Sequence, residues 1–109
     1  MKSPTTARFD AALKAEEGDY VLRLYTVGPT PAAQSAISNL RQICEQELKG
    51  RYSLEVIDIT QRPALAEQEQ IVAVPMLIKA LPAPVARLVG DLSNREKVLV
   101  GLDLLPRPR

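Results

Sequence analysis

Residues 20–31, YVLRLYTVGPTP, join a predicted strand to a predicted helix. The first part, 20–27, is rich in β-branched and aromatic side chains, which is typical of a buried strand, and a glycine-proline pair then interrupts it. Thr30 offers a side-chain N-cap, and Pro31 suits the first position of a helix. The run therefore predicts a buried strand, a tight turn and a helix start.

The helix is predicted to continue to Gly50, because apolar residues recur at helical spacing. These residues are Ala33, Ile37, Leu40, Ile43, Cys44 and Leu48. The sequence SLEVIDI at 53–59 is long and apolar enough for a second strand. A strand, a helix and a strand in this order form a βαβ unit, whose two strands are parallel with a right-handed crossover.

The second half predicts shorter elements. Pro63 can begin a helix that ends before Val74 and Pro75, since a residue ahead of proline avoids the helical region. Two strands are predicted at 76–80 and 85–89, and together they form a hairpin-like pair.

A last helix is predicted from a capping box formed by Ser93 and Glu96. Its buried face would consist of Val98, Leu99, Leu102 and Leu105. The resulting order is β-α-β-α-β-β-α, which is the α/β order of thioredoxin-like domains.

We expect one domain at 20–105, because a chain of 109 residues has the length of a single domain. Residues 1–19 form a predicted polar N-terminal extension, and 106–109 form a short C-terminal tail.

The composition argues against several classes of function. A formal net charge of +1 does not favour nucleic-acid binding. No apolar run approaches the length of a spanning helix, and the first ten residues lack the apolar core of a signal peptide. One cysteine makes neither an internal disulfide nor a thiolate metal cage. We therefore expect a cytoplasmic protein that binds neither membrane nor nucleic acid.

The sequence does not favour an enzyme. A thioredoxin-type oxidoreductase needs a cysteine at the start of the first helix, and residues 27–31 contain none. Cys44 falls on the apolar face of that helix, where it is expected to be a small core residue. The chain has no histidine and no glycine-rich phosphate-binding motif, so no cofactor is expected.

Three aspartates lie on separate predicted elements, namely Asp58, Asp91 and Asp103. They could converge in the fold, although turn chemistry for Asp91 and solvated positions for the other two are the ordinary expectations.

Pro75 has a different significance. A proline at the head of a strand in this topology is a candidate cis-proline, and it would leave backbone groups free to pair with an incoming chain. A simple strand-start proline is the alternative. The charged residues Glu67, Arg87, Arg95 and Lys97 are either solvated or part of a partner surface.

Three segments of the chain resemble the KaiB family of clock proteins: 20–31, 56–79 and GDLSNREKVLVGLDLL at 90–105. The resemblance covers about 20–105. It implies a non-catalytic protein that binds the ATPase ring of KaiC, competes with the SasA-type kinase module and captures KaiA, or serves a reduced system without KaiA. The partner contacts that it implies fall on Glu55, Asp58, Gln61, Glu67 and Arg87.

The same resemblance implies a metamorphic protein. A homo-oligomeric ground state, dimer or tetramer, would have the order β-α-β-β-α-α-β and would exchange with a thioredoxin-like monomer. The second half has four prolines and short apolar runs of ambiguous period, so neither packing is strongly dictated. Gly90 and Asp91 are the predicted hinge.

Two other functions stay open from the sequence. A redox protein would require a reactive Cys44. A generic thioredoxin-like adaptor would bind a partner unrelated to KaiC, and fold alone does not exclude it.

Overall fold

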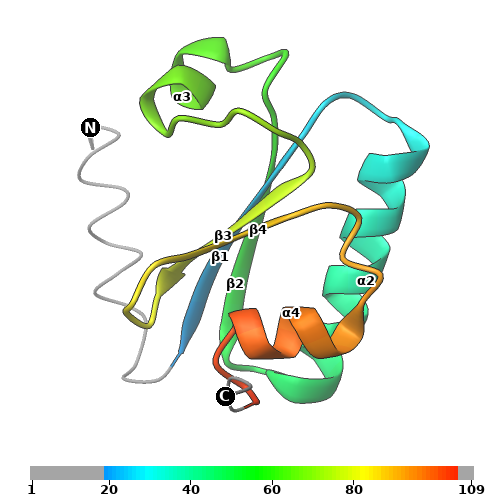
Figure 1. The fold of residues 1–109 in the computed structure, drawn as a ribbon, viewed down its shortest axis with the longest axis vertical. Coiled ribbons are helices and arrows are strands. Elements are labelled where there is room, and N and C mark those ends of the chain that lie inside the picture. Colours follow the sequence, from blue (N-terminus) through cyan, green and yellow to red (C-terminus); the bar gives the residue numbers. More distant parts are fainter. Residues whose placement is uncertain (1–18, 106–109) are drawn as a thin grey trace.

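The computed structural model of the chain describes residues 19–105 (Figure 1). The predicted extension before Asp19 and the predicted tail at 106–109 lie outside these residues. The elements are β1 (Tyr20–Thr26), α2 (Pro31–Glu47), β2 (Tyr52–Asp58), α3 (Pro63–Gln68), β3 (Met76–Leu81), β4 (Ala86–Val89) and α4 (Arg95–Gly101). The predicted order of strands and helices is confirmed.

The four strands form one mixed sheet in the order β2-β1-β3-β4. β1 and β2 are parallel, with Leu22 opposite Leu54, as the βαβ prediction requires. β3 runs antiparallel to both β1 and β4. The sheet is therefore the thioredoxin-like one, with β2 and β4 at its two edges.

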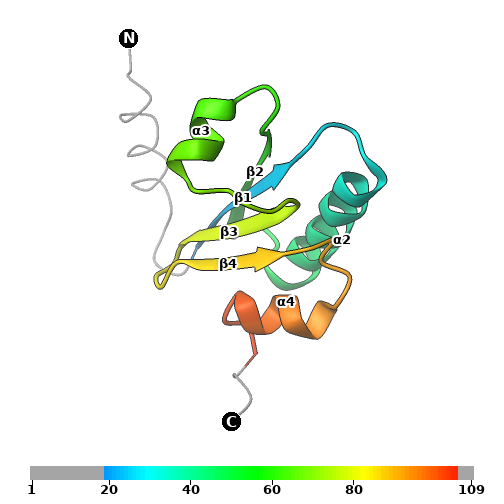
Figure 2. The same ribbon diagram turned by 45° about the horizontal axis from the view of Figure 1, so that its top comes forward.

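Alternation along the strands divides the core into two parts. Leu22 and Leu24 of β1 face α2 and α4 and are fully buried, whereas Tyr25 faces α3. Figure 2 shows α2 and α4 on one side of the sheet and α3 on the other. The larger core lies on the α2 and α4 side, and a smaller cluster of Tyr25, Ile57, Met76 and Ile78 lies under α3.

The helix ends follow the expected chemistry in one case and not in the other. Thr30 caps α2 as predicted, accepting a hydrogen bond from the Ala33 amide at 3.1 Å. The capping box at Ser93 is wrong. Asn94 is the N-cap of α4 and accepts from the Lys97 amide at 3.1 Å. The Ser93 amide instead donates to Asp91 Oδ1, which places Ser93 in the preceding turn.

The predicted buried face of the last helix is also wrong at its end. α4 stops at Gly101, and Asp103 then has a φ of 60°. This left-handed residue turns the chain, so that Leu102 is buried and Leu105 is 39% exposed. The prediction assumed that helical spacing continues to Leu105, but the helix ends at Gly101.

Candidate partner-binding surface

The residues implied as partner contacts lie around α3 and along its side of the sheet. Glu55 is on β2, Asp58 ends that strand and Gln61 is in the following turn. Glu67 is on α3 and Arg87 is on β4, at the opposite edge of the sheet. Four of the five are exposed and Asp58 is partly exposed, so all five reach the surface.

Glu55 belongs to a layer of charges beneath α3. Arg23 of β1 lies 3.9 Å from Glu55 and 3.7 Å from Glu69, and Arg62 lies 3.8 Å from Glu55. The side chains of Glu55 and Arg62 are more than half exposed, so solvent screens their attraction. These pairs orient the start and the end of α3 over the sheet and contribute little stability.

Asp58 is held in a tight turn at the end of β2. Its Oδ1 accepts from the Thr60 amide at 2.9 Å and from the Thr60 hydroxyl at 2.6 Å. These bonds, together with one from the Gly28 backbone, lower the pKa of the Asp58 carboxyl below its ordinary value. The carboxylate therefore stays ionised and connects this turn to the turn between β1 and α2.

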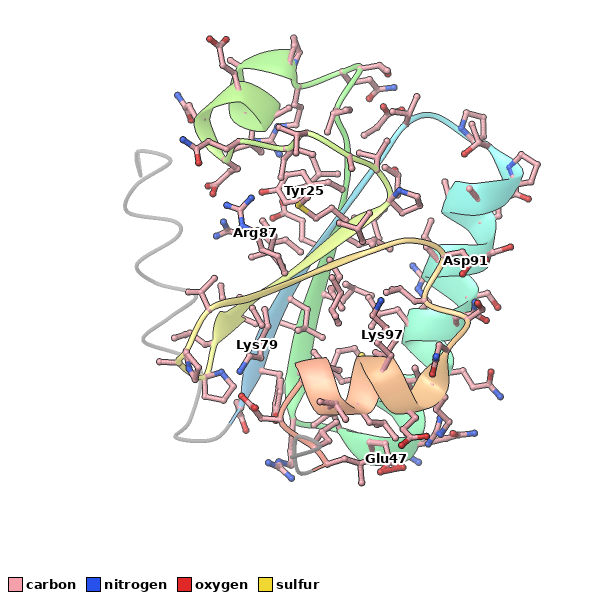
Figure 3. All side chains as sticks on the ribbon, viewed as in Figure 1. Tyr25, Glu47, Lys79, Arg87, Asp91 and Lys97 are labelled. Carbon is pink, nitrogen blue, oxygen red and sulfur yellow. The ribbon has the colours of Figure 1, made fainter. Side chains whose placement is uncertain are left out.

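Arg87 has a structural role that the sequence did not indicate. Its guanidinium donates to the carbonyl of Glu69 at 2.8 Å and to that of Gln70 at 3.3 Å, and it contacts Met76 Sδ at 3.8 Å. Figure 3 shows the side chain extending toward α3. Arg87 thus satisfies carbonyl groups just beyond the end of α3. No local signal reveals this role, because Arg87 and Glu69 are far apart in sequence.

Gly90 and Asp91 form the connection between β4 and α4. Gly90 has a φ of 119°, which favours glycine, and its amide donates to the Pro75 carbonyl at 2.9 Å. Asn39 of α2 donates to the Asp91 carbonyl at 2.9 Å. Hydrogen bonds from Ser93 lower the pKa of the Asp91 side chain. The connection is thus held by Pro75, just before β3, and by Asn39 of α2, and its role as a hinge stays a prediction.

The Val74–Pro75 peptide bond is cis, as are the bonds that precede Pro82 and Pro84. Met76, the next residue, begins β3 and pairs with Tyr25 of β1. The cis-proline turn therefore lies next to the carboxyl end of β1.

Cys44 has the environment of an unreactive thiol. It is fully buried in the larger core, and burial raises its pKa from 9.0 to about 11. A thiolate nucleophile requires the opposite, a lowered pKa at an accessible position. The residues at the start of α2, where thioredoxins carry their reactive sulfur, are Gly28, Pro29 and Thr30.

The three aspartates do not share a site, because each has hydrogen-bond or ion-pair partners in a different part of the fold. The carboxylates of Asp58 and Asp91 each accept hydrogen bonds from a residue two positions later in the same turn. Asp103 is exposed, as expected, but its Oδ2 also lies 2.9 Å from Lys79 Nζ, a contact that the sequence did not indicate. Lys79 is only 1% exposed, so tertiary packing buries a lysine that the strand pattern did not single out. Within 19–105, no cluster of three or more potential metal ligands is found.

No helix in the described part of the chain has the length and apolar character needed to cross a bilayer.

Comparison with known proteins identifies relatives of this chain. A family model described as the KaiB domain matches residues 23–104. A protein named circadian clock oscillator protein KaiB, from Prochlorococcus marinus (strain MIT 9312), is 56% identical over 86 residues, covering 79% of this chain and 82% of the relative.

Solved structures give the same fold. The N-terminal domain of Synechococcus elongatus SasA matches with a TM-score of 0.66 and 25% identity, covering 88% of this chain and 94% of that domain. Mitochondrial thioredoxin 3 from Saccharomyces cerevisiae matches with a TM-score of 0.67 and 12% identity, covering 91% and 90% of the two chains. The latter likeness concerns the fold alone.

Proposed function

The chain belongs to the KaiB family, and on that premise we propose that it is a non-catalytic clock-type protein that binds the ATPase ring of a KaiC-type partner. Binding would modulate the phosphorylation cycle of the ring. The observation that carries the proposal is the likeness of this fold to the SasA N-terminal domain, because two domains of one shape can compete for one site.

The environment of the thiol supports binding rather than redox chemistry. Thioredoxin chemistry needs an accessible thiolate, and Cys44 is buried with a raised pKa. Function on this scaffold is then a matter of surface complementarity, which belongs to the site and not to the fold.

The surface proposed for the ring consists of Glu55, Asp58, Gln61, Glu67 and Arg87 around α3. Its carboxylates would meet basic groups of the partner. Arg87 would contribute chiefly by holding the end of α3 in place. We also propose that the protein captures a KaiA-type protein and is located in the cytoplasm. When free it would form a homo-oligomer with a second fold, and Gly90 and Asp91 would be the hinge between the two folds.

The proposal is tested by size-exclusion chromatography with light scattering. The protein is mixed with its cognate KaiC hexamer in the presence of nucleotide and incubated for about a day, since conformational exchange can be slow. Co-elution with the hexamer is the expected result. Failure to co-elute over that period contradicts the proposal and favours an adaptor with another partner.

A matched pair of variants locates the surface. Gln61→Lys adds a positive charge to the turn before α3, and Gln46→Lys adds the same charge to an exposed position on α2. We expect the first to weaken co-elution roughly tenfold and the second to leave it unchanged, since like charge across an interface is unfavourable. Equal effects of both variants would place the contact elsewhere.

A further inference from the structure

The free edge of β4 combines three features that together suit an extended chain. β4 is the last strand of the sheet and, among the described strands, pairs only with β3. A pocket adjoins the carboxyl end of β4. Two positively charged side chains, Arg87 and Lys97, lie on opposite faces of the edge. We propose that this edge binds an extended segment of a partner protein that carries both acidic and apolar side chains, by adding it to the sheet as a further strand.

The hydrogen-bond pattern shows which backbone groups are available. In an antiparallel pair, hydrogen-bonded and non-hydrogen-bonded positions alternate. The Gly90 amide donates to the Pro75 carbonyl at 2.9 Å. Because the pattern alternates, the backbone amides and carbonyls of Leu88 and Ala86 also point toward β3. The amides and carbonyls of Arg87 and Val89 therefore point away from β3, toward the open edge.

The side chains at this edge are suited to contact with a partner. Val89 is 55% exposed and Val85, just before the strand, is 63% exposed. The pocket has a volume of about 210 Å³, and its lining includes Leu88, Val89, Leu92 and Val98. An apolar side chain of an added strand can enter this space, whereas alternate side chains of the same strand stay on the other face.

The charges favour an acidic segment. Arg87 and Lys97 form no ion pair within residues 19–105, although Arg87 donates hydrogen bonds to two carbonyl groups. Arg87 extends toward α3, whereas Lys97 extends from α4 toward the connection that follows β4 (Figure 3). Lys97 also lines the pocket, together with Asp91, whose carboxylate accepts a hydrogen bond from the Ser93 amide. The two positive charges flank the edge from opposite faces, so carboxylates on both faces of an added strand would be attracted.

This edge is distinct from the surface proposed for the KaiC-type ring, with only Arg87 common to both. Binding at this edge does not depend on binding to a KaiC-type ring, and it is measured in the absence of KaiC.

The test uses the full chain and a fluorescein-labelled ten-residue peptide in which pairs of glutamate alternate with pairs of valine. Both faces of the peptide strand then carry acidic and apolar groups. We expect saturable binding by fluorescence anisotropy that weakens as salt is added, since salt screens exposed charges. The peptide with lysine in place of glutamate should bind at least tenfold more weakly. Equal affinity for the two peptides would overturn the proposal.

Two substitutions separate backbone pairing from charge. Val89→Pro removes an outward-facing amide that takes no part in pairing with β3, and we expect at least a tenfold loss of affinity. Lys97→Gln should weaken binding about threefold, and Lys49→Gln, at an exposed position after α2, should not. Unchanged affinity in a folded Val89→Pro variant would contradict strand addition.

A measurement on the unmodified protein keeps the test independent of folding of the variants. In amide NMR spectra, the acidic peptide should shift the signals of Arg87 and Val89, and their hydrogen exchange should slow. A peptide N-methylated at alternate residues should lose these effects. Shifts confined to other strands would refute the site.

Discussion

Residues 20–58 and residues 63–105 are held in place by different means. The first half has two strands of seven residues and a helix of 17 residues, joined through a buried aliphatic face. The second half has elements of four to seven residues, and side-chain hydrogen bonds or ion pairs hold each of its two helices. Local pattern and apolar burial define the first half, whereas the second half combines apolar burial with specific long-range polar contacts.

Two polar contacts link the first half to the second. Tyr20 donates its hydroxyl to the Leu102 carbonyl at 2.7 Å, and Arg95 pairs with Glu47 at 3.0 Å. Each link joins an element of the first half to the segment at 90–105. The segment at 90–105 is therefore joined to the first half by polar links as well as by Leu92, Val98, Leu99 and Leu102, which are buried in the larger core.

The largest expected effect concerns the closed core of the first half. Cys44 in the native protein should react with a disulfide reagent at pH 8 at least about a thousandfold more slowly than in urea, because reaction requires opening of the core. The rate is followed by absorbance of the released thiolate. Fast reaction in the native state would mean that the core around Cys44 is not closed to solvent.

The same thiol makes stability depend on pH. Its folded pKa of about 11 lies above the ordinary 9.0, so the neutral form is favoured by folding. The stability that it contributes is complete below pH 9 and is lost as pH rises toward 11. Urea midpoints at pH 8 and pH 10.5 should differ more for the wild type than for Cys44→Ala.

The next largest effect concerns the link at the end of α4. Asp103→Asn keeps a residue that tolerates the left-handed backbone but leaves the buried Lys79 ammonium without its carboxylate, at an expected cost of about 2 kcal/mol in unfolding free energy. Lys79→Met leaves a carboxylate that is 40% exposed and can be hydrated, so it should cost less. Urea denaturation compares the two. The reverse order would show that Lys79 reaches solvent.

A smaller effect is expected where Arg87 holds α3. Arg87→Ala removes hydrogen bonds to two carbonyl groups and should cost about 1 kcal/mol. The loss should be local, seen as faster hydrogen exchange over 63–75 with little change over 20–58. Arg95→Ala, which breaks a surface ion pair, is the control and should cost only a few tenths of a kcal/mol. Uniformly faster exchange would argue against separate behaviour of the two halves.

The smallest effect concerns Gly101, the last residue of α4. Alanine gains up to about 1 kcal/mol of helix propensity, whereas its Cβ would lie 2.7 Å from a methyl group of Leu88. Leu88 is only partly buried and its end can move. We therefore expect Gly101→Ala to raise stability by about 0.5 kcal/mol in thermal or urea unfolding. A lower midpoint would show that the contact between α4 and β4 is rigid.

The candidate surface was predictable in part. The resemblance indicated residues that lie at the surface around α3, but it did not indicate that Arg87 binds the carbonyls beyond that helix. The sequence also did not distinguish Asp58, which is partly exposed and bonded within its own turn, from Asp103, whose partner is a buried lysine. These distinctions depend on residues that are distant in sequence.

The sequence by itself determined the order of strands and helices, the cap at Thr30, the buried thiol and the family. Each of these follows from local periodicity, from capping or turn chemistry, or from motifs that are contiguous in the chain. Only the tertiary structure decided that Asn94 and not Ser93 caps α4, that Lys79 is buried against Asp103, and that the backbone groups of Arg87 and Val89 point away from β3. These outcomes depend on which segments meet in space, and a one-dimensional pattern does not contain that information.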